Sequence, residues 1–138
     1  MKETNKGSCL CESISFQISG SIGKVYFCHC KQCRSWGGHY CAAVGINKTQ
    51  LSFSKSDNLK WFASSENAQR GFCGDCGSSL FFKEKGSSGI FIWAGTISDQ
   101  ADLEPGAHMY TKDSGSYYSI PNDCEHFDHD IAEDHSFE

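Results

Sequence analysis

The stretch "YFCHCKQCRSWGGHYC", residues 26–41, holds four cysteines in sixteen positions. Three of them, Cys28, Cys30 and Cys33, are separated by one and two residues, and Cys41 follows after a longer gap. Such short spacings are typical of metal-binding loops and unlike most disulfide frameworks. The stretch therefore predicts a fold that is organised around a bound metal ion.

The rest of the sequence indicates that the protein is located in a reducing compartment and that its cysteines bind zinc. The chain has 138 residues and nine cysteines, an odd number that disulfides cannot pair completely. Its first residues, "MKETNKGS", lack the apolar segment of a secretory signal, and apolar runs such as "IFIWA" are far too short to cross a membrane. We therefore expect a cytoplasmic protein with no membrane partner, in which thiolates bind zinc.

Two further cysteine pairs predict a structural zinc site. Cys9 and Cys11 stand two residues apart, so on a strand their side chains would point to the same side. Cys73 and Cys76 lie in "FCGDCGSS", where two glycines permit a tight backbone turn. Two plus two thiolates complete a tetrahedral site with no free position. Such a site would tie the N-terminal strand to the middle of the chain.

The cysteines of the opening stretch predict a second zinc site of a different kind. Cys28, Cys30 and Cys33 supply three ligands, and three protein ligands with one open position are usual for catalytic zinc. The alternative is a second structural zinc with Cys41 as its fourth ligand. His39 is a further candidate, either as a ligand or as an acid or base beside the metal. His29 is a weaker candidate, because strand alternation would point it away from its neighbours.

The hydrophobic pattern predicts an all-β protein. In "ISFQIS" the residues Ile14, Phe16 and Ile18 alternate with polar ones, and no window shows the apolar stripe of a long helix. Helix is expected only as single turns, near "KQCRS" and "SDQADL". The expected strands are residues 14–19, 24–28, 40–46, 51–54, 59–63, 79–83, 89–97, 107–111 and 116–120.

Charge divides the chain into a zinc-binding domain, residues 1–120, and an acidic C-terminal tail, residues 121–138. Residues 1–112 carry all twelve Lys and Arg and nine acids, whereas residues 113–138 carry eight acids and no base. We expect the tail to be solvated and partly disordered. The alternative is a flap over the site or a partner contact, with His126, His129 and His135 as additional metal ligands.

Four segments together resemble a known family. "GSCLCESISF", "FCHCKQCRSWGGHY", "RGFCGDCGSSLFF" and "WAGTISD…AHMYTKD" follow one another as in the glutathione-dependent formaldehyde-activating enzymes, which include centromere protein V. The resemblance runs from about Gly7 to Tyr118. It implies a β-tent fold of short antiparallel sheets held by zinc. It also implies the zinc ligands: Cys9, Cys11, Cys73 and Cys76 for the structural ion, and Cys28, Cys30 and Cys33 for the catalytic ion.

The chain departs from this family at two places. Tyr117 and Tyr118 stand where family members often have a tryptophan, and the acidic "IPNDCEHFDHD" replaces a short proline-containing ending. Neither departure touches the cysteines. Both concern loops around the site, which are expected to select the substrate.

The resemblance implies a zinc-dependent carbon–sulfur lyase or synthase that acts on glutathione adducts, like S-(hydroxymethyl)glutathione synthase. Three thiolates make Zn²⁺ a weak Lewis acid toward water but a good host for a further thiolate, here a small-molecule thiol such as glutathione. Attack of that sulfur on formaldehyde would give S-(hydroxymethyl)glutathione. The candidates for binding glutathione carboxylates are Lys31, Arg34 and Arg70, and the candidates for protonating the product oxygen are His39 and Tyr40.

The competing interpretation is a non-catalytic, zinc-stabilised protein-binding module with two structural zinc sites. Trp36, Trp61 and Trp93 would then be possible anchors for the partner. A nucleic-acid partner is disfavoured, because the sequence has no basic stripe and two sites with seven thiolates would cancel the positive charge of residues 1–112. The oligomeric state is left open by these patterns.

Overall fold

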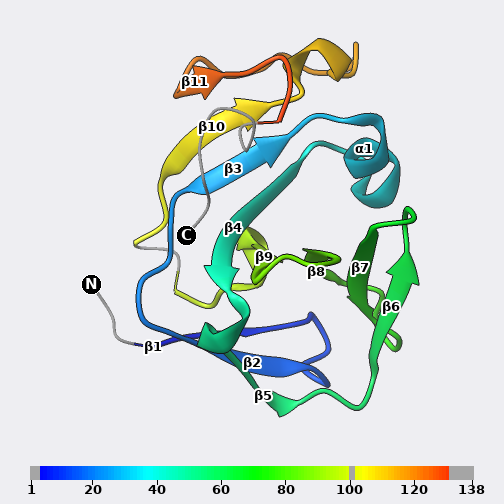
Figure 1. Cartoon of the computed structure of the whole chain (residues 1–138), viewed down its shortest axis with the longest axis vertical. Helices are drawn as coiled ribbons and strands as arrows, with labels where there is room; N and C mark the ends of the chain where they lie inside the picture. Colours follow the sequence, from blue (N-terminus) through cyan, green and yellow to red (C-terminus); the bar gives the residue numbers. More distant parts are fainter. Residues whose placement is uncertain (1–3, 100–101, 131–138) are drawn as a thin grey trace.

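The computed structural model of the chain describes residues 4–99 and 102–130, and Figure 1 shows that its elements are mostly strands. This confirms the predicted all-β class. The strands are β1 (Thr4–Ser8), β2 (Ser15–Ser19), β3 (Val25–Cys28), β4 (Cys41–Asn47), β5 (Leu51–Lys55), β6 (Leu59–Ala63), β7 (Ala68–Cys73), β8 (Ser79–Glu84), β9 (Gly89–Trp93), β10 (Pro105–Met109) and β11 (Glu125–His126). The helical segments are α1 (Lys31–Gly37) and the 3₁₀ turns η1 (Lys48–Gln50), η2 (Ala94–Thr96) and η3 (Thr111–Asp113).

The described strands form two sheets. One has three strands in the order β1-β2-β5, and the other has eight in the order β11-β10-β3-β4-β9-β8-β7-β6. In Figure 1 the larger sheet curves, so that β3 and β4 lie on one side and β7 and β6 on the other, with the smaller sheet across one end. Gly7 of β1 forms an antiparallel bridge to Ile97, which follows β9 and η2, so the bridge ties the smaller sheet to the segment that leaves the larger one. Only glycine fits there, because a Cβ atom would lie 2.4 Å from the Phe16 ring.

Most strand pairs are antiparallel, as predicted, but the edge of the larger sheet is an exception. There β10 runs parallel to β3 and to β11. Parallel pairing requires a long connection, and here more than seventy residues separate β3 from β10. That this arrangement is the β-tent of the family remains a prediction.

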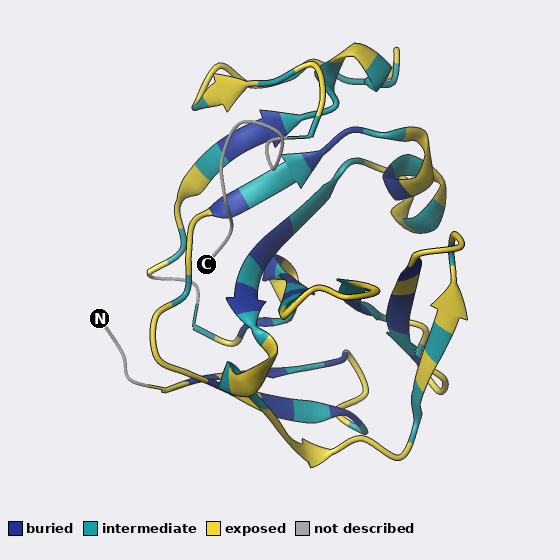
Figure 2. Cartoon of the chain, viewed as in Figure 1, coloured by how far each residue is buried: buried dark blue, intermediate teal, exposed yellow. Residues whose placement is uncertain are grey.

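The hydrophobic core lies where the smaller sheet packs against the larger one. Ile14, Phe16 and Ile18 are fully buried, so the alternation read from the sequence correctly identifies the inner face of β2. The Phe16 ring meets the Phe81 ring edge to face at 5.2 Å between centroids. Figure 2 shows buried segments on β2, β4 and β7 facing the inside, while β5 and β6 are largely exposed.

The sequence predicted most elements but not all. Strands occur within eight of the nine expected segments, and α1 begins at the predicted turn near residue 31. Residues 116–120 form a turn, so the strand expected there is wrong. The second expected helical turn, residues 98–103, lies partly outside the described residues, and its described part is not helical. Within the described ranges no helix is long and apolar enough to cross a membrane.

The first part of the acidic tail is packed against the sheet. Besides the β10–β11 pairing, the Phe127 N–H donates to the His108 carbonyl at 2.8 Å, and the Tyr110 N–H donates to the His129 carbonyl at 3.1 Å. Backbone pairing therefore holds part of residues 121–130 against the sheet, while most of these residues are exposed to solvent, and the expectation of a solvated, partly disordered tail stays a prediction. Residues 131–138, including His135, lie outside the described residues, and the division of the chain at residue 120 stays a prediction.

Candidate active site

The structure brings together the four cysteines that were predicted to form a closed site. The sulfurs of Cys9, Cys11, Cys73 and Cys76 all lie within 4.8 Å of one another. Cys11 Sγ is 3.7 Å from both Cys9 Sγ and Cys73 Sγ. Cys9 and Cys11 do not lie on a strand as expected. They follow β1 in a turn, where Glu12 adopts a positive φ of 65°.

The segment from Cys73 to Gly77 has the backbone of a metal-binding knuckle. The N–H groups of Asp75 and Cys76 each donate to Cys73 Sγ at 3.4 Å, which favours a thiolate there. Gly77 ends the turn with φ +78°, a conformation that favours glycine. A hydrogen bond from Ser78 lowers the pKa of Cys76 to about 5. These contacts prepare the four sulfurs for a soft cation such as Zn²⁺.

The second cluster is built on the junction of β3 and α1. Cys28 is the last residue of β3, Cys30 caps α1, and Cys33 lies in the first turn of that helix. The Cys33 N–H donates to Cys30 Sγ at 3.4 Å, and Gly38 ends the helix with φ 85°. The sulfurs of all three cysteines lie within 4.8 Å of one another. Their donor set fits one thiophilic metal ion with a coordination position left for another ligand.

Cys41 lies beside this cluster and not within it. It begins β4 opposite Cys28, and its thiol donates to Cys33 Sγ at 3.5 Å. It does not belong to the group whose sulfurs all lie within 4.8 Å of one another. His39 is also outside that group, and its ring packs against the Tyr40 ring at 4.2 Å between centroids.

Hydrogen bonds among the thiols set the order in which they ionise. The pKa of Cys33 is lowered, first by hydrogen bonds from Cys28 and Cys30 and further by the positive charge of Arg70. The pKa of Cys28 is raised, because its thiol is shared first with Cys30 and then with Cys33. The first thiolate of the cluster is therefore held on Cys33, where it is ready to bind a metal ion.

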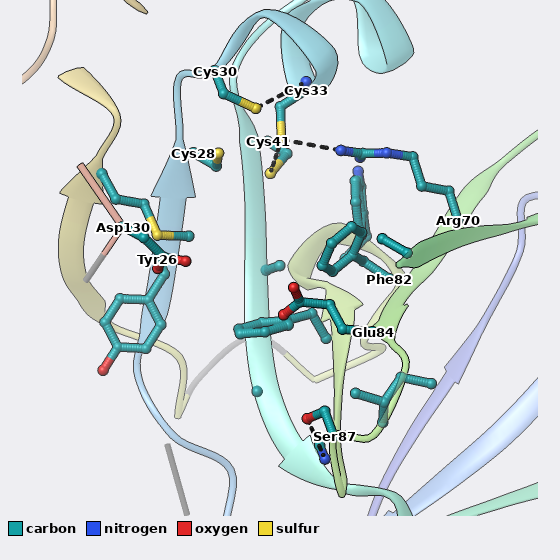
Figure 3. A pocket seen from close by; sticks show the side chains of 18 of the residues that line it. Tyr26, Cys28, Cys30, Cys33, Cys41, Arg70, Phe82, Glu84, Ser87 and Asp130 are labelled. Atoms are coloured by element: carbon teal, nitrogen blue, oxygen red, sulfur yellow. Dashed lines mark hydrogen bonds between the residues drawn. The ribbon is translucent and has the colours of Figure 1, made fainter. Parts of the chain in front are cut away.

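The three-cysteine cluster lies at one end of a pocket of about 440 Å³ (Figure 3). Ala43, Ile90 and Phe91 line its apolar wall. Its charged lining groups are Arg70, Glu84 and Asp130. In Figure 3 Arg70 points toward the cysteines, whereas Glu84 at the end of β8 and Ser87 in the turn after it lie farther from them. Four candidates from the sequence do not belong to the described lining: Lys31, Arg34, His39 and Tyr40.

Of the three basic candidates, only Arg70 faces the pocket. Its side chain is 3% exposed, and its Nη2 lies 3.4 Å from Gln32 Oε1 and 3.7 Å from Cys33 Sγ. Arg34 instead donates from Nε to the carbonyls of His29 and Asp113, so it holds the loop of η3 near α1. Lys31 is exposed at the start of α1. No local pattern distinguishes these three basic residues, because the burial of a side chain depends on strands that are distant in the chain.

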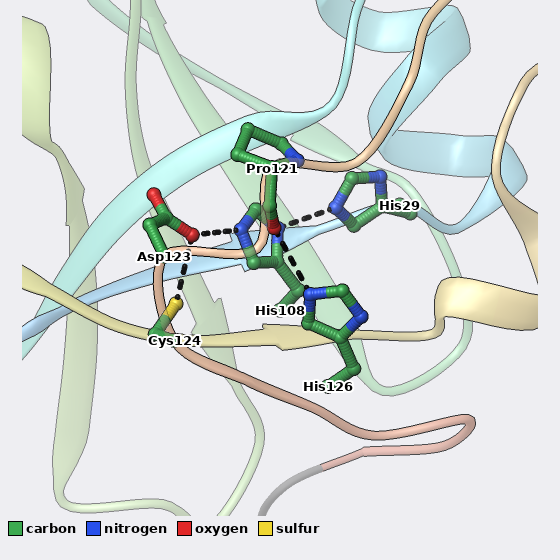
Figure 4. Close-up of polar contacts among 6 residues, drawn as sticks. All are labelled: His29, His108, Pro121, Asp123, Cys124 and His126. Atoms are coloured by element: carbon green, nitrogen blue, oxygen red, sulfur yellow. Dashed lines mark hydrogen bonds and ion pairs between the residues drawn. The ribbon is translucent and has the colours of Figure 1, made fainter.

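The opposite face of β3 carries a buried polar chain that the sequence analysis missed. It links Tyr118 Oη to His29 Nδ1 at 2.8 Å, His29 Nε2 to His108 Nδ1 at 2.8 Å, and His108 Nε2 to Asp123 Oδ1 at 2.9 Å. Figure 4 shows the last two of these contacts. The Asp123 carboxylate accepts from His108 Nε2; when both rings are neutral, His29 Nε2 donates to His108 Nδ1 and the Tyr118 hydroxyl donates to His29 Nδ1. Burial, and next the His108 charge, lowers the pKa of His29 to about 4, which keeps that ring neutral.

The predicted tail ligands have other contacts in the described part of the chain. His126 Nε2 donates to the Pro121 carbonyl at 3.0 Å, and His129 meets β10 through its own carbonyl. Asp123 and Cys124 do lie near His108, with donor atoms within 4.8 Å of one another. Their hydrogen bonds account for this proximity, since Asp123 accepts from both His108 and Cys124.

Comparison with known proteins agrees with this geometry. The sequence model of the glutathione-dependent formaldehyde-activating enzymes matches residues 4–113, a range that includes all seven clustered cysteines. The chain belongs to this family. Among similar proteins is an uncharacterized lyase of Schizosaccharomyces pombe, 29% identical over 123 residues, which are 88% of this chain and 89% of the lyase.

A solved structure supports the fold of this formaldehyde-activating family member. The crystal structure of a Rhodobacter sphaeroides protein superposes with a TM-score of 0.58 at 18% sequence identity. The match covers 67% of this chain and 87% of that protein. At this identity the likeness concerns the fold alone.

Proposed function

We propose that this protein is a zinc-dependent carbon–sulfur lyase or synthase that acts on adducts of glutathione with formaldehyde. Family membership supports an enzyme of the lyase type. The observation that carries the finer proposal is the convergence of Cys28, Cys30 and Cys33 at one end of a pocket. We further propose two zinc ions per chain, the other held by Cys9, Cys11, Cys73 and Cys76. A reducing compartment such as the cytoplasm suits a protein whose thiols must stay unpaired.

The proposed reaction joins a thiol and an aldehyde without any redox change. The sulfur forms a bond to the carbonyl carbon, the carbon–oxygen π electrons move to oxygen, and the thiol proton ends on that oxygen; lysis reverses each step. When bound, zinc would lower the pKa of a ligand thiol and hold it as a nucleophile. The chain contributes a thiolate on Cys33, an apolar wall along the pocket, and the buried charge of Arg70.

The earlier candidates for proton transfer lie outside this pocket. Tyr40 and His39 pack with Tyr118 on the other face of the sheet, at 5.0 and 4.8 Å between ring centroids. Glu84 and Asp130 are the carboxyl groups of the described lining. A proton donor or relay for the new hydroxyl should therefore be sought among the lining groups and the solvent that enters the pocket.

The activity is tested by NMR exchange measurements with ¹³C-formaldehyde and glutathione. The zinc-loaded protein should speed the interconversion of free formaldehyde and S-(hydroxymethyl)glutathione above the uncatalysed rate. Cys30→Ser should abolish the acceleration, whereas Cys124→Ser, which removes a thiol outside both clusters, should retain it. A rate equal to the uncatalysed one in protein that carries both zinc ions would refute the proposal.

One observation favours the second candidate, a binding module with two closed zinc sites. The Cys41 thiol is 3.5 Å from Cys33 Sγ, close enough for a small movement to bring it to the metal. In that case cobalt(II) in the site would already have four sulfur ligands. Its thiolate bands would then not respond to glutathione.

A further inference from the structure

Arg70 is a buried cation whose hydrogen-bonding capacity is mostly unused. Its side chain is 3% exposed, yet Nε and Nη1 have no hydrogen-bond partner among the described residues. Only Nη2 makes polar contacts, to Gln32 Oε1 and Cys33 Sγ. Burying a charged group with unsatisfied N–H groups is costly, and native proteins rarely keep such groups without a partner. The missing partner is therefore expected to be a ligand.

The surroundings hold the guanidinium in one place. Its Cζ lies 5.1 Å from the Phe82 ring centroid and 5.9 Å from the Trp36 ring centroid. Such contacts stabilise a cation and leave its N–H groups free to point at a partner. Arg70 also lines the pocket beside the three cysteines, so a ligand in the pocket can reach it. Gln32 and Cys33 account for Nη2 of the guanidinium and leave Nε and Nη1 for the ligand.

The charges along the pocket narrow the class of ligand. Arg70 is next to the cysteine cluster, whereas the carboxylate of Glu84 lies farther along the same pocket and Asp130 lies beside Tyr26, on the side away from Arg70 (Figure 3). A ligand that matches this order has an anionic group near its sulfur-binding end and tolerates or carries a positive group beyond it. Amino-acid and peptide thiols have carboxylate and ammonium groups of this kind. Neutral alkyl thiols match only the apolar wall.

We infer that Arg70 forms an anion-binding subsite that accepts the carboxylate of a thiol ligand. This inference rests on the proposed function, since it assumes that a thiol occupies the pocket at the three-cysteine cluster. It adds the substrate class: thiols that carry a carboxylate, selected over neutral thiols of the same size. A guanidinium donates charge-assisted hydrogen bonds to carboxylate oxygens, which are about twice as strong as neutral ones.

The test compares matched thiols on the cobalt(II)-loaded full-length protein, by titrating the thiolate absorption bands. The probes are 3-mercaptopropionate and 3-mercaptopropionamide, which differ in charge but hardly in size. We expect the acid to bind about tenfold tighter, the size of one charge-assisted hydrogen bond. Glutathione and its glycine ethyl ester, titrated in the same way, would show whether the glycine carboxylate is the one that reaches Arg70.

Variants connect this preference to Arg70. Arg70→Gln should bind the acid and the amide equally, whereas Lys31→Gln, which removes a nearby positive charge outside the pocket, should keep the tenfold ratio. Should Arg70→Gln fail to fold, Arg70→Lys retains the buried charge but loses the planar set of donors, and the ratio should drop to about threefold or less.

The outcomes separate this inference from the proposed function. Cobalt bands that respond to both thiols with no preference for the acid would overturn the inference and leave the enzyme proposal standing. A preference that persists unchanged in Arg70→Gln would do the same, because the anion site would then be elsewhere. Bands that respond to no thiol would overturn both.

Discussion

The two cysteine clusters contain the same side chain but are assembled in different ways. In the four-cysteine cluster, Cys11 and Cys73 meet across 62 positions of sequence, so the cluster joins distant parts of the chain. In the three-cysteine cluster all sulfurs come from residues 28–33, at one junction of a strand and a helix. The first arrangement closes a long loop, whereas the second presents its sulfurs locally.

The surroundings of the four-cysteine cluster and the three-cysteine cluster also differ. Cys9 and Cys73 belong to the hydrophobic core, and serine hydroxyls lie near the sulfurs, with Ser13 Oγ 3.3 Å from Cys73 Sγ. The three-cysteine cluster instead opens on the pocket and has the cation of Arg70 beside it. The proposed difference in role therefore rests on what faces the sulfurs and on how much chain they connect, and not on the number of sulfurs.

The largest expected effect concerns stability. Cys73→Ala should lower the free energy of unfolding by at least about 3 kcal/mol or prevent folding, because metal-binding free energy is folding free energy in a small domain. Cys30→Ala should cost much less, since its cluster closes no long loop. Chemical denaturation followed by circular dichroism measures both. A larger loss of stability in Cys30→Ala than in Cys73→Ala would contradict the proposal that the four-cysteine cluster is the structural site.

Metal content gives the next largest difference. We expect about two zinc ions per chain in protein never exposed to a chelator and about one in Cys30→Ala. Inductively coupled plasma mass spectrometry measures the number of zinc ions per chain. One ion in the unmodified protein would contradict the two-site proposal, whereas a third ion that disappears in Cys124→Ser would show that the His108, Asp123 and Cys124 group binds metal.

A smaller effect concerns the polar chain on the face of β3 opposite the pocket. Asp123→Ala should lower stability by about 1–3 kcal/mol, because it leaves the buried His108 ring without its acceptor. Zinc content should stay the same. Asp128→Ala serves as the control, since its hydrogen bond to Thr111 is exposed and its loss should cost less than about 0.5 kcal/mol. Equal losses of stability in the two variants would mean that the hydrogen bond from His108 to Asp123 contributes no more than an exposed one.

The smallest expected effect is that of Cys41→Ala. If Cys41 only lies beside the cluster, its removal should cost about 1 kcal/mol or less, the size of one weak hydrogen bond. Zinc content and the response of the cobalt bands to glutathione should both persist. Loss of the second zinc in this variant would show that Cys41 closes the site, and the two clusters would then be alike.

How far the sequence predicts this molecule depends on whether a signal is local. Cysteine spacings grouped the seven thiols in the same two sets that the structure brings together, because short loops determine which sulfurs converge. Alternation identified β2 in the same way. That these sets bind zinc remains a prediction.

Features that depend on distant pairing were missed. Residues 116–120 are rich in aromatic side chains and were expected to form a strand. Instead Tyr118 packs against His29, with the ring centroids 5.5 Å apart, and bonds to it. The strands β1 and β7 lack clear alternation, and β10 joins β3 in parallel only through tertiary packing. The burial of Arg70 and the hydrogen bond from His108 to Asp123 also depend on contacts between distant segments, so no local sequence pattern predicts them.

The different spans of the two clusters have a consequence for biosynthesis. A chain leaves the ribosome from its N-terminus, so Cys28, Cys30 and Cys33 are available together early in translation. Cys9 and Cys11 emerge even earlier but must wait for Cys76 before their site is complete. During that interval the nascent chain exposes an unpaired pair of thiols beside a complete set of three. We therefore expect the three-cysteine cluster to acquire its metal before the four-cysteine cluster, and zinc limitation during synthesis to leave unfinished chains with only the three-cysteine cluster filled.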